Sequence, residues 1–380
     1  MIINGDCRII MQQLDAEQYY TCVTSPPYWG LRDYGVPGSE WPEVTYTPMP
    51  GLPPVTVPAW NGCLGLEPTP EMFVAHMVLV FREVWRVLRP DGTLWMNFGD
   101  SYAGTGKSGG GCQGEKWKTA GAAASEGIGT WQPPPRHLKN KDLIGIPWRV
   151  AFALQADGWF LRMDNIWSKP NPMPESVTDR PTKSHEYFFL LSKSERYYYD
   201  GDAIQEPIAA ASVARLSQDV ENQAGSERAN GGSRAERAMK AVGGSKGAFG
   251  PEQSRRRSGN KERKYGDDRT RLGSDMGSSF PWEGSTRNKR SVWTVSTAKY
   301  NEAHFATFPE KLVEPCVLAG APVGGRVLDP FGGSGTTLKV SLENGRECTI
   351  IELNENYAAI AERRTATVQP KMQFGGEVEP

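Results

Sequence analysis

Apolar residues recur every three or four positions between residues 69 and 88, which is the spacing of one buried helix face. Thr69 suits the N-cap of this helix and Pro70 suits its first turn. The turn 89–92 should end the helix, and the apolar run 93–98 then predicts a strand. Further strands are expected at 20–24, 159–167, 187–191, 326–329 and 348–352, and further helices at 143–155, 310–319, 337–343 and 357–364. Strands that alternate with helices favour an α/β fold with a doubly wound parallel sheet.

Three stretches lack this periodicity. Residues 36–68 are rich in Pro and Gly and predict an irregular loop, and residues 103–135 predict a mobile loop. Residues 201–291 are polar and rich in Gly and Ser. Within them, positions 211–290 hold 17 Lys and Arg against 10 Asp and Glu, a balance of +7 in a chain whose net charge is -1. One basic segment on an otherwise acidic chain suggests a local contact with phosphates.

The remaining bulk features exclude several classes of protein. No apolar run approaches the roughly 20 residues that cross a bilayer, and the start of the chain lacks the zones of a signal peptide, so we expect a cytoplasmic protein with no membrane partner. Six cysteines stand at 7, 22, 63, 112, 316 and 348, and there are four histidines. Because the cysteines form no Cys-x-x-Cys pair, we expect no metal site.

A glycine-rich loop follows the strand expected at 326–329 and precedes a helix. It reads Asp329-Pro330-Phe331-Gly332-Gly333-Ser334-Gly335-Thr336-Thr337, and Glu352 ends the next strand 23 residues after Asp329. That distance is close to the spacing at which an acid meets ribose hydroxyls in nucleotide-binding folds. The third glycine of the dinucleotide fingerprint is missing, because position 338 is Leu. Asp329 would repel a diphosphate but attract an ammonium group. These charges favour S-adenosyl-L-methionine over NAD as the cofactor.

The segment Ser25-Pro26-Pro27-Tyr28 follows the strand expected at 20–24. Two successive prolines stiffen the backbone, so the Ser25 hydroxyl and the Pro26 carbonyl can face one bound group. An exocyclic amino group offers two N–H donors and needs two such acceptors. Tyr28 supplies an aromatic face for a base extruded from a duplex.

Together, the two motifs resemble those of the amino-methylating DNA methyltransferases, which act on adenine N6 or cytosine N4. Their order, catalytic motif first and cofactor loop last, is similar to the beta arrangement of that family. The resemblance implies a Rossmann-like, circularly permuted methyltransferase sheet with an inserted recognition region. It divides the chain into a catalytic half (1–200), a basic target-recognition insertion (201–291), a cofactor-binding half (292–366) and a tail (367–380).

The resemblance also implies roles for single residues. Asp6 would contact the adenine of the cofactor, Glu352 its ribose, and the segment Thr307-Phe308-Pro309 with Lys311 would close over its methionine end. The loop contacts would come from Asp329, Phe331, Gly333, Ser334, Gly335 and Thr336. The catalytic residues would be Ser25, Pro26, Pro27 and Tyr28. In this context, double-stranded DNA is the expected partner, and we expect contacts with it from Trp29, Arg255, Arg256, Arg257, Lys261, Arg263 and Lys264.

The sequence therefore predicts methyl transfer from S-adenosyl-L-methionine to the amino group of a flipped base. Ser at position 25 leans towards cytosine N4 within the family, but adenine N6 fits the chemistry about equally. A protein-amide or RNA methyltransferase and a catalytically silent DNA-binding protein are the alternatives. The order of the motifs argues against the first, and the intact Ser-Pro-Pro-Tyr argues against the second. Cys316 falls in an expected helix, so we interpret it as a core residue and not as the thiolate of a cytosine-C5 enzyme. We interpret His185-Glu186 as structural, and a homodimer is left open.

Overall fold

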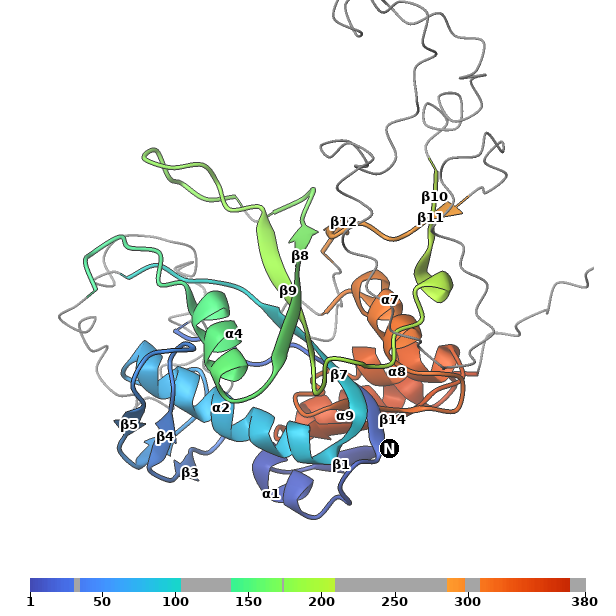
Figure 1. Cartoon of the computed structure of the whole chain (residues 1–380), viewed down its shortest axis with the longest axis horizontal. Coiled ribbons are helices and arrows are strands. Elements are labelled where there is room, and N and C mark those ends of the chain that lie inside the picture. Colours follow the sequence, from blue (N-terminus) through green and yellow to red (C-terminus); the bar gives the residue numbers. More distant parts are fainter. Residues whose placement is uncertain (31–34, 104–137, 173, 209–285, 298–307, 370–380) are drawn as a thin grey trace, which may run out of the picture. The chain divides into compact units, whose positions relative to one another are not determined.

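The computed structural model describes residues 1–30, 35–103, 138–172, 174–208, 286–297 and 308–369 (Figure 1). The chain forms two compact units. One comprises residues 1–204 with 289–380, and the other comprises residues 205–288. In the second unit, the described residues include the short antiparallel pair β10 (Glu206–Pro207) and β11 (Thr286–Arg287). The first unit holds the central sheet.

This sheet has eight strands and takes them from both ends of the chain. In spatial order they are β1 (Ile2–Asn4), β14 (Glu347–Glu352), β13 (Arg326–Asp329), β2 (Tyr19–Thr24), β7 (Leu88–Phe98), β9 (His185–Ser192), β8 (Phe160–Ser168) and β12 (Val292–Thr294). Ile2 pairs with Ile350, and Leu328 pairs with Cys22. The expected meeting of the two chain ends in one sheet is confirmed. That this order is a circular permutation stays a prediction.

One strand departs from the expected parallel sheet. β9 runs antiparallel to both of its neighbours, β7 and β8, whereas the other pairs in the sheet are parallel. A parallel return would require a crossover connection, usually a helix. The described residues of the connection 169–184 form no helix, so the chain turns back beside β8 and the sheet is mixed.

Helices cover both faces of the sheet. They are α1 (Cys7–Gln12), α2 (Pro70–Val87), α4 (Ile146–Ala156), α7 (Glu310–Gly320), α8 (Thr336–Glu343) and α9 (Glu355–Thr365), with a short 3-10 turn η1 (Asp202–Ile204). The expected N-cap of α2 is confirmed, because the Thr69 hydroxyl accepts a hydrogen bond from the Met72 amide at 3.2 Å. Along β7 the side chains alternate: Leu94 and Met96 pack with α2 and α4, while Trp95 joins the cluster that contains α7 and α8. The doubly wound α/β class is confirmed.

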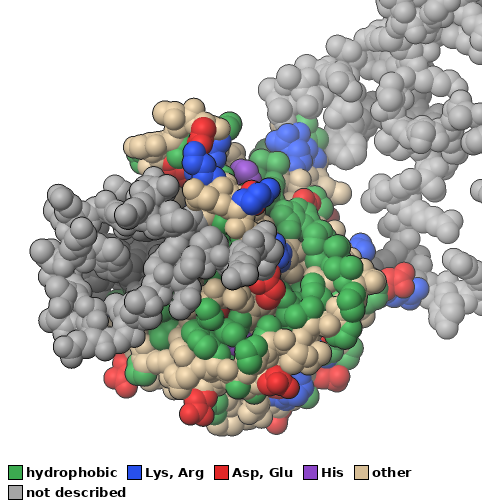
Figure 2. All heavy atoms as spheres, turned by 90° about the vertical axis from the view of Figure 1, so that its left-hand side faces the viewer, with side chains coloured by type: hydrophobic (Ala, Val, Ile, Leu, Met, Phe, Trp, Pro, Cys, Tyr) green, Lys and Arg blue, Asp and Glu red, His purple; other side chains and the backbone are tan. Residues whose placement is uncertain are grey.

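The stretch 36–68 is more regular than expected. It forms an arm of two short antiparallel pairs, β3 (Ser39–Trp41) with β6 (Trp60–Gly62) and β4 (Val44–Tyr46) with β5 (Val55–Val57). Their β-branched and aromatic residues favour strands, although Pro and Gly separate them. Figure 2 views the side of the molecule that carries this arm and shows hydrophobic side chains over much of it. Those of the arm include Met49, Leu52, Val55 and Leu66.

The described residues contain neither a membrane-spanning helix nor a metal-binding cluster. None of their helices is long and apolar enough to cross a membrane. They also contain no group of three or more His, Cys, Asp or Glu side chains placed to hold a metal ion. The loop expected at 103–135 falls almost wholly outside the described residues.

Candidate active site

The candidate site lies along one edge of the sheet. β1, β14, β13, β2 and β7 all run parallel, so their carboxyl ends share this edge. Ligands of open α/β sheets bind at such an edge. Asp6 follows β1, the glycine-rich loop follows β13, and the segment 25–28 follows β2. Glu352 is the last residue of β14, and Asn97 lies near the end of β7. The sheet thus aligns in space two motifs that are about 300 residues apart in the sequence.

The loop after β13 turns through two glycines in the left-handed region. Gly333 has a φ of +51° and Gly335 a φ of +79°, where a side chain would strain the backbone. Gly335 packs on α9, because a Cβ there would lie 2.8 Å from the Cβ of Ala361. At Gly333 the nearest described atom to such a Cβ would be the Phe331 carbonyl oxygen at 4.0 Å. One side of the loop is therefore packed, and the other has room for a ligand.

Asp329 joins this loop to the segment 25–28. Its carboxylate accepts hydrogen bonds from the Thr24 hydroxyl at 2.7 Å, the Thr337 hydroxyl at 2.7 Å and the Phe331 amide at 3.0 Å. Asp329 is 3% exposed, and burial raises the pKa of its carboxyl. Since Thr24 immediately precedes Ser25, the hydrogen bond from Thr24 fixes the start of the segment 25–28 to the loop. We expect Asp329 to act by holding these two segments together.

Two acidic residues stand at neighbouring strand ends. The Glu352 carboxylate accepts from the Gly333 amide at 2.7 Å and from the Asn354 amide at 2.8 Å, and burial raises the pKa of its carboxyl. Burial also opposes ionisation of Asp6, but hydrogen bonds and the charge of Arg8 lower the pKa of Asp6. A carboxylate has about four acceptor positions. Glu352 therefore keeps more capacity for a ligand than Asp6, whose oxygens already accept three bonds from Arg8.

The described part of the segment before α7 packs on the sheet. The Phe308 ring stacks on the Phe188 ring with centroids 5.7 Å apart, and Pro309 is the N-cap residue of α7. Lys311 is exposed on the first turn of α7. Thr307 lies outside the described residues. This part of the expected cofactor set is thus only partly placed.

Ser25 and Tyr28 meet a polar cluster formed by Asn97 and Glu186. The Ser25 hydroxyl donates to Asn97 Oδ1 at 3.5 Å, and the Tyr28 hydroxyl lies 3.0 Å from that atom and 2.8 Å from Glu186 Oε2. Asn97 is oriented by its amide, which donates to the Tyr187 carbonyl at 3.0 Å. Glu186 in turn forms an ion pair with Lys169. The Tyr28 ring packs closely on Gly99, where a Cβ would lie 2.6 Å from it. These contacts fix both the hydroxyl and the plane of the Tyr28 ring.

The arm supports the same segment from the other side. The Trp29 indole donates to the Glu67 carbonyl at 2.9 Å, and the Gly30 amide donates to the Gly65 carbonyl at 2.8 Å. The Glu67 carboxyl is bonded to His76 of α2 at 2.9 Å, and both of these side chains are fully buried. Trp29 is therefore tied to the arm, and its expected contact with DNA stays a prediction. The basic residues expected to bind DNA, from Arg255 to Lys264, lie outside the described residues.

Comparison with known proteins decides the family. A family model described as DNA methylase, of the N6 and N4 type, matches residues 20–363. The chain belongs to this family. It is 39% identical to the Type II methyltransferase M.SmaI of Serratia marcescens, over 96% of this chain and 89% of that protein. It is 37% identical to the Type II methyltransferase M.Cfr9I of Citrobacter freundii, over 96% of this chain and 86% of that protein.

This DNA methylase is similar in fold to a solved structure. That structure is the PvuII DNA methyltransferase, described as cytosine-N4-specific, which aligns with a TM-score of 0.52 and 16% identity over 96% of this chain and 85% of that one. The resemblance of the chain to the amino-methylating DNA methyltransferases, which the two sequence motifs indicated, is confirmed by the family match.

Sequence reasoning missed two polar residues of the site of this DNA methylase. Asn97 is 1% exposed and is the one polar residue of the otherwise apolar run 94–98; a buried amide in such a run was the signal that could have found it. Glu186 was interpreted as structural with His185, yet its carboxylate lies beside the Tyr28 hydroxyl. Cys316, in contrast, is fully buried in α7 and burial raises the pKa of its thiol, as a core residue requires.

Proposed function

We propose that this DNA methylase transfers a methyl group from S-adenosyl-L-methionine to the exocyclic amino group of a base flipped out of duplex DNA. The observation that carries the proposal is the pair of bonds from Thr24 and Thr337 to Asp329, each 2.7 Å long. They hold the proline-stiffened acceptor segment against the open glycine loop. A methyl donor in that loop and an amino group on that segment would be neighbours, which is the proximity that direct transfer needs.

The residues present fit this cofactor. The open space at Gly333 admits a ligand beside the loop backbone, and the Glu352 carboxylate can accept hydrogen bonds from ribose hydroxyls. Asp6, which follows the neighbouring strand β1, would accept a hydrogen bond from the adenine amino group. We assign the remaining contacts to Phe308, Pro309, Lys311, Phe331, Ser334, Gly335 and Thr336, with Thr307. When bound, S-adenosyl-L-methionine supplies a methyl group activated by its positively charged sulfur.

The catalytic segment would orient the amino group. Asn97 Oδ1 takes the hydrogen of the Ser25 hydroxyl, so the lone pairs of that hydroxyl are left to accept one amino hydrogen. The Pro26 carbonyl would accept the other, and the Tyr28 ring would stack on the base. Held in this way, the amino nitrogen would face the methyl group that S-adenosyl-L-methionine supplies, and the amino proton lost on transfer would leave to water. No covalent nucleophile is required.

The target base is adenine or cytosine. Ser25 is neutral where other members of the family carry an acid, and this favours cytosine N4. Both bases present the same two N–H donors to Ser25 and Pro26, so the nucleoside product must decide. We assign recognition of the DNA sequence to residues 201–291, with phosphate contacts from the arginines and lysines between 255 and 264 and a contact from Trp29.

Transfer of a radiolabelled methyl group to duplex DNA tests the proposal. The wild-type chain should label DNA, and Ser25→Ala should lower kcat/KM by at least about tenfold, because one amino hydrogen loses its acceptor. Ser194→Ala is the matched control, since this hydroxyl bonds the Pro90 carbonyl far from the segment 25–28 and should leave the rate unchanged. Unlabelled DNA, or equal rates for the two variants, would contradict the proposal.

A further inference from the structure

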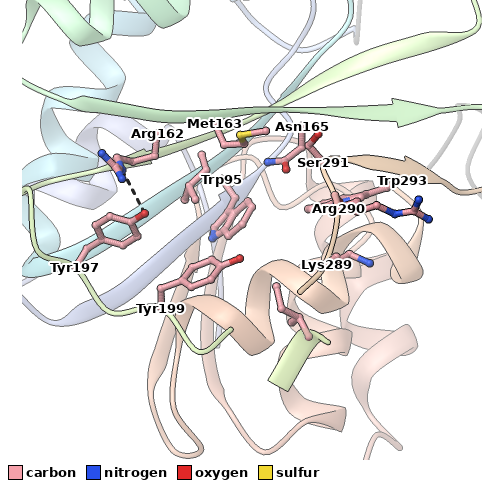
Figure 3. Close-up of a pocket in the computed structure, with 12 residues that line it drawn as sticks. Trp95, Arg162, Met163, Asn165, Tyr197, Tyr199, Lys289, Arg290, Ser291 and Trp293 are labelled. Carbon is pink, nitrogen blue, oxygen red and sulfur yellow. Dashed lines mark hydrogen bonds between the residues drawn. The ribbon is translucent and has the colours of Figure 1, made fainter. Parts of the chain in front are cut away.

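A cavity lies on the sheet face that carries Trp95, and it shares no lining residue with the candidate site (Figure 3). Its volume is about 240 Å³. The side chains that matter for its chemistry are three aromatic residues and three cations: Trp95, Tyr199, Trp293, Arg162, Lys289 and Arg290. None of the described lining residues is acidic. Such a cavity suits an anionic ligand with a flat ring.

Trp95 provides a donor that no described residue uses. Trp95 is 2% exposed, and its indole N–H has no hydrogen-bond partner within the described part of the chain. A buried donor without an acceptor is unfavourable, so a ligand that brings an acceptor would be favoured at this wall of the cavity. The Tyr199 ring lies nearly parallel to the indole, at 24° and with centroids 6.5 Å apart. Figure 3 shows the indole nitrogen on the side that faces this ring.

The cations surround these rings on two sides. Lys289 lies 5.3 Å from the centroid of the Trp293 ring, which is a cation–π distance. Arg162 extends from β8 and donates to the Tyr197 hydroxyl at 3.3 Å, on the other side of Trp95 from Lys289 (Figure 3). Positive charge without a described carboxylate in the lining attracts phosphate, and stacked aromatic rings attract bases.

We propose that this cavity binds a nucleotide, with its base against the Tyr199 ring, an acceptor of the nucleotide at the Trp95 indole N–H, and its phosphate near Lys289. The nucleotide is either part of a DNA strand or free in solution, since both present the same chemistry. The lining residues 197–204 and 289–293 flank the stretch 205–288 in the sequence. The site is separate from the proposed methyl-transfer site, and the inference does not depend on that function.

The test uses the full chain, two probes and three variants. Deoxycytidine and deoxyadenosine monophosphates are titrated by calorimetry, and a fluorescent DNA duplex is titrated by anisotropy at several salt concentrations. Lys289→Ala removes the cation and Tyr199→Leu removes the ring. Arg82→Ala is the control, because this arginine lies on α2 and pairs with Asp157. Thermal unfolding checks that each variant folds, and methyl transfer is measured separately, so that a failure of the proposed activity is not confused with a failure of this site.

We expect Lys289→Ala and Tyr199→Leu each to weaken binding of at least one probe by about tenfold. A loss confined to the duplex, with a salt slope lowered by about one for Lys289→Ala, assigns the cavity to a nucleotide of the strand. A loss with the monophosphates assigns it to a free nucleotide. Affinities of both variants that match Arg82→Ala for both probes overturn the proposal.

Discussion

Replacing Tyr28 by Phe removes one oxygen from the candidate site and keeps the aromatic ring. In the wild-type protein, that hydroxyl lies 2.8 Å from Glu186 Oε2 and 3.0 Å from Asn97 Oδ1. The ring of the variant should still stack on a base, but its position would no longer be fixed by the two polar side chains. We therefore expect the effect to fall on orientation of the base during transfer, and so on kcat more than on DNA affinity.

The size of the effect follows from the contact that is lost. A hydrogen bond to a charged group contributes about 1.5–3 kcal/mol. Glu186 is 15% exposed and also pairs with Lys169, so water and the ammonium group screen part of this contribution. The lower end, about 1.5 kcal/mol, corresponds to about a tenfold fall in kcat. Tyr28→Ala also removes the ring, so it should lose a further stacking energy of about 1–3 kcal/mol.

A double-mutant cycle with Glu186→Gln isolates this hydrogen bond. Glu186→Gln keeps the shape of the side chain and removes its charge, and we expect a fall in kcat of about fivefold. If both residues act through one bond, the double variant should be no slower than Tyr28→Phe alone. Initial rates of methyl transfer at saturating DNA and cofactor provide the measurement. Fully additive losses would refute the coupling, and unchanged rates in Tyr28→Phe would refute the role of the hydroxyl.

Three further predictions concern Asp329, Glu352 and the core residue Cys316. Because burial raises the pKa of Asp329 in the folded chain, its carboxyl binds protons more tightly there than in the unfolded chain. The stability of the wild type relative to Asp329→Asn should therefore fall as the pH rises above about 4, which urea unfolding at several pH values would show; a rising difference would contradict this. Glu352→Gln should weaken S-adenosyl-L-methionine binding by about tenfold in calorimetry, while Glu347→Gln, at the other end of β14, should not; equal affinities would remove Glu352 from the cofactor set. Cys316→Ala should keep its methyl-transfer rate and lose only about 1 kcal/mol of stability, whereas loss of activity in a folded variant would revive a thiolate mechanism.

Local signals were sufficient for much of the fold. The 3.6-residue spacing and the Thr69 cap located α2, and the glycines after Asp329 located the loop, because each signal lies within a few residues of the structure it produces. The β-branched residues of Val44-Thr45-Tyr46 were hidden among prolines and glycines, so the arm was interpreted as irregular. The antiparallel direction of β9 depends on how its connection packs, which no local pattern records.

The polar cluster at Tyr28 could not be predicted from local sequence patterns either. Pairing of β7 with β9 places Asn97 opposite Phe188, and this register carries Glu186 to the end of β7. Sequence spacing cannot give that register, since the two strands are about 90 residues apart. Asp329 was expected to face the cofactor because of its charge. Its burial under two threonines, one of them more than 300 residues away, became visible only in the folded sheet.

The most direct test of the central claim is the chemical identity of the product. Duplex DNA is incubated with the full chain and with S-adenosyl-L-methionine carrying a deuterated methyl group, then digested to nucleosides and analysed by mass spectrometry. The site described above predicts deuterated N4-methylcytosine or N6-methyladenine, and markedly less of it with Ser25→Ala. A methyl group on carbon 5 of cytosine, or none on any base, would contradict the account.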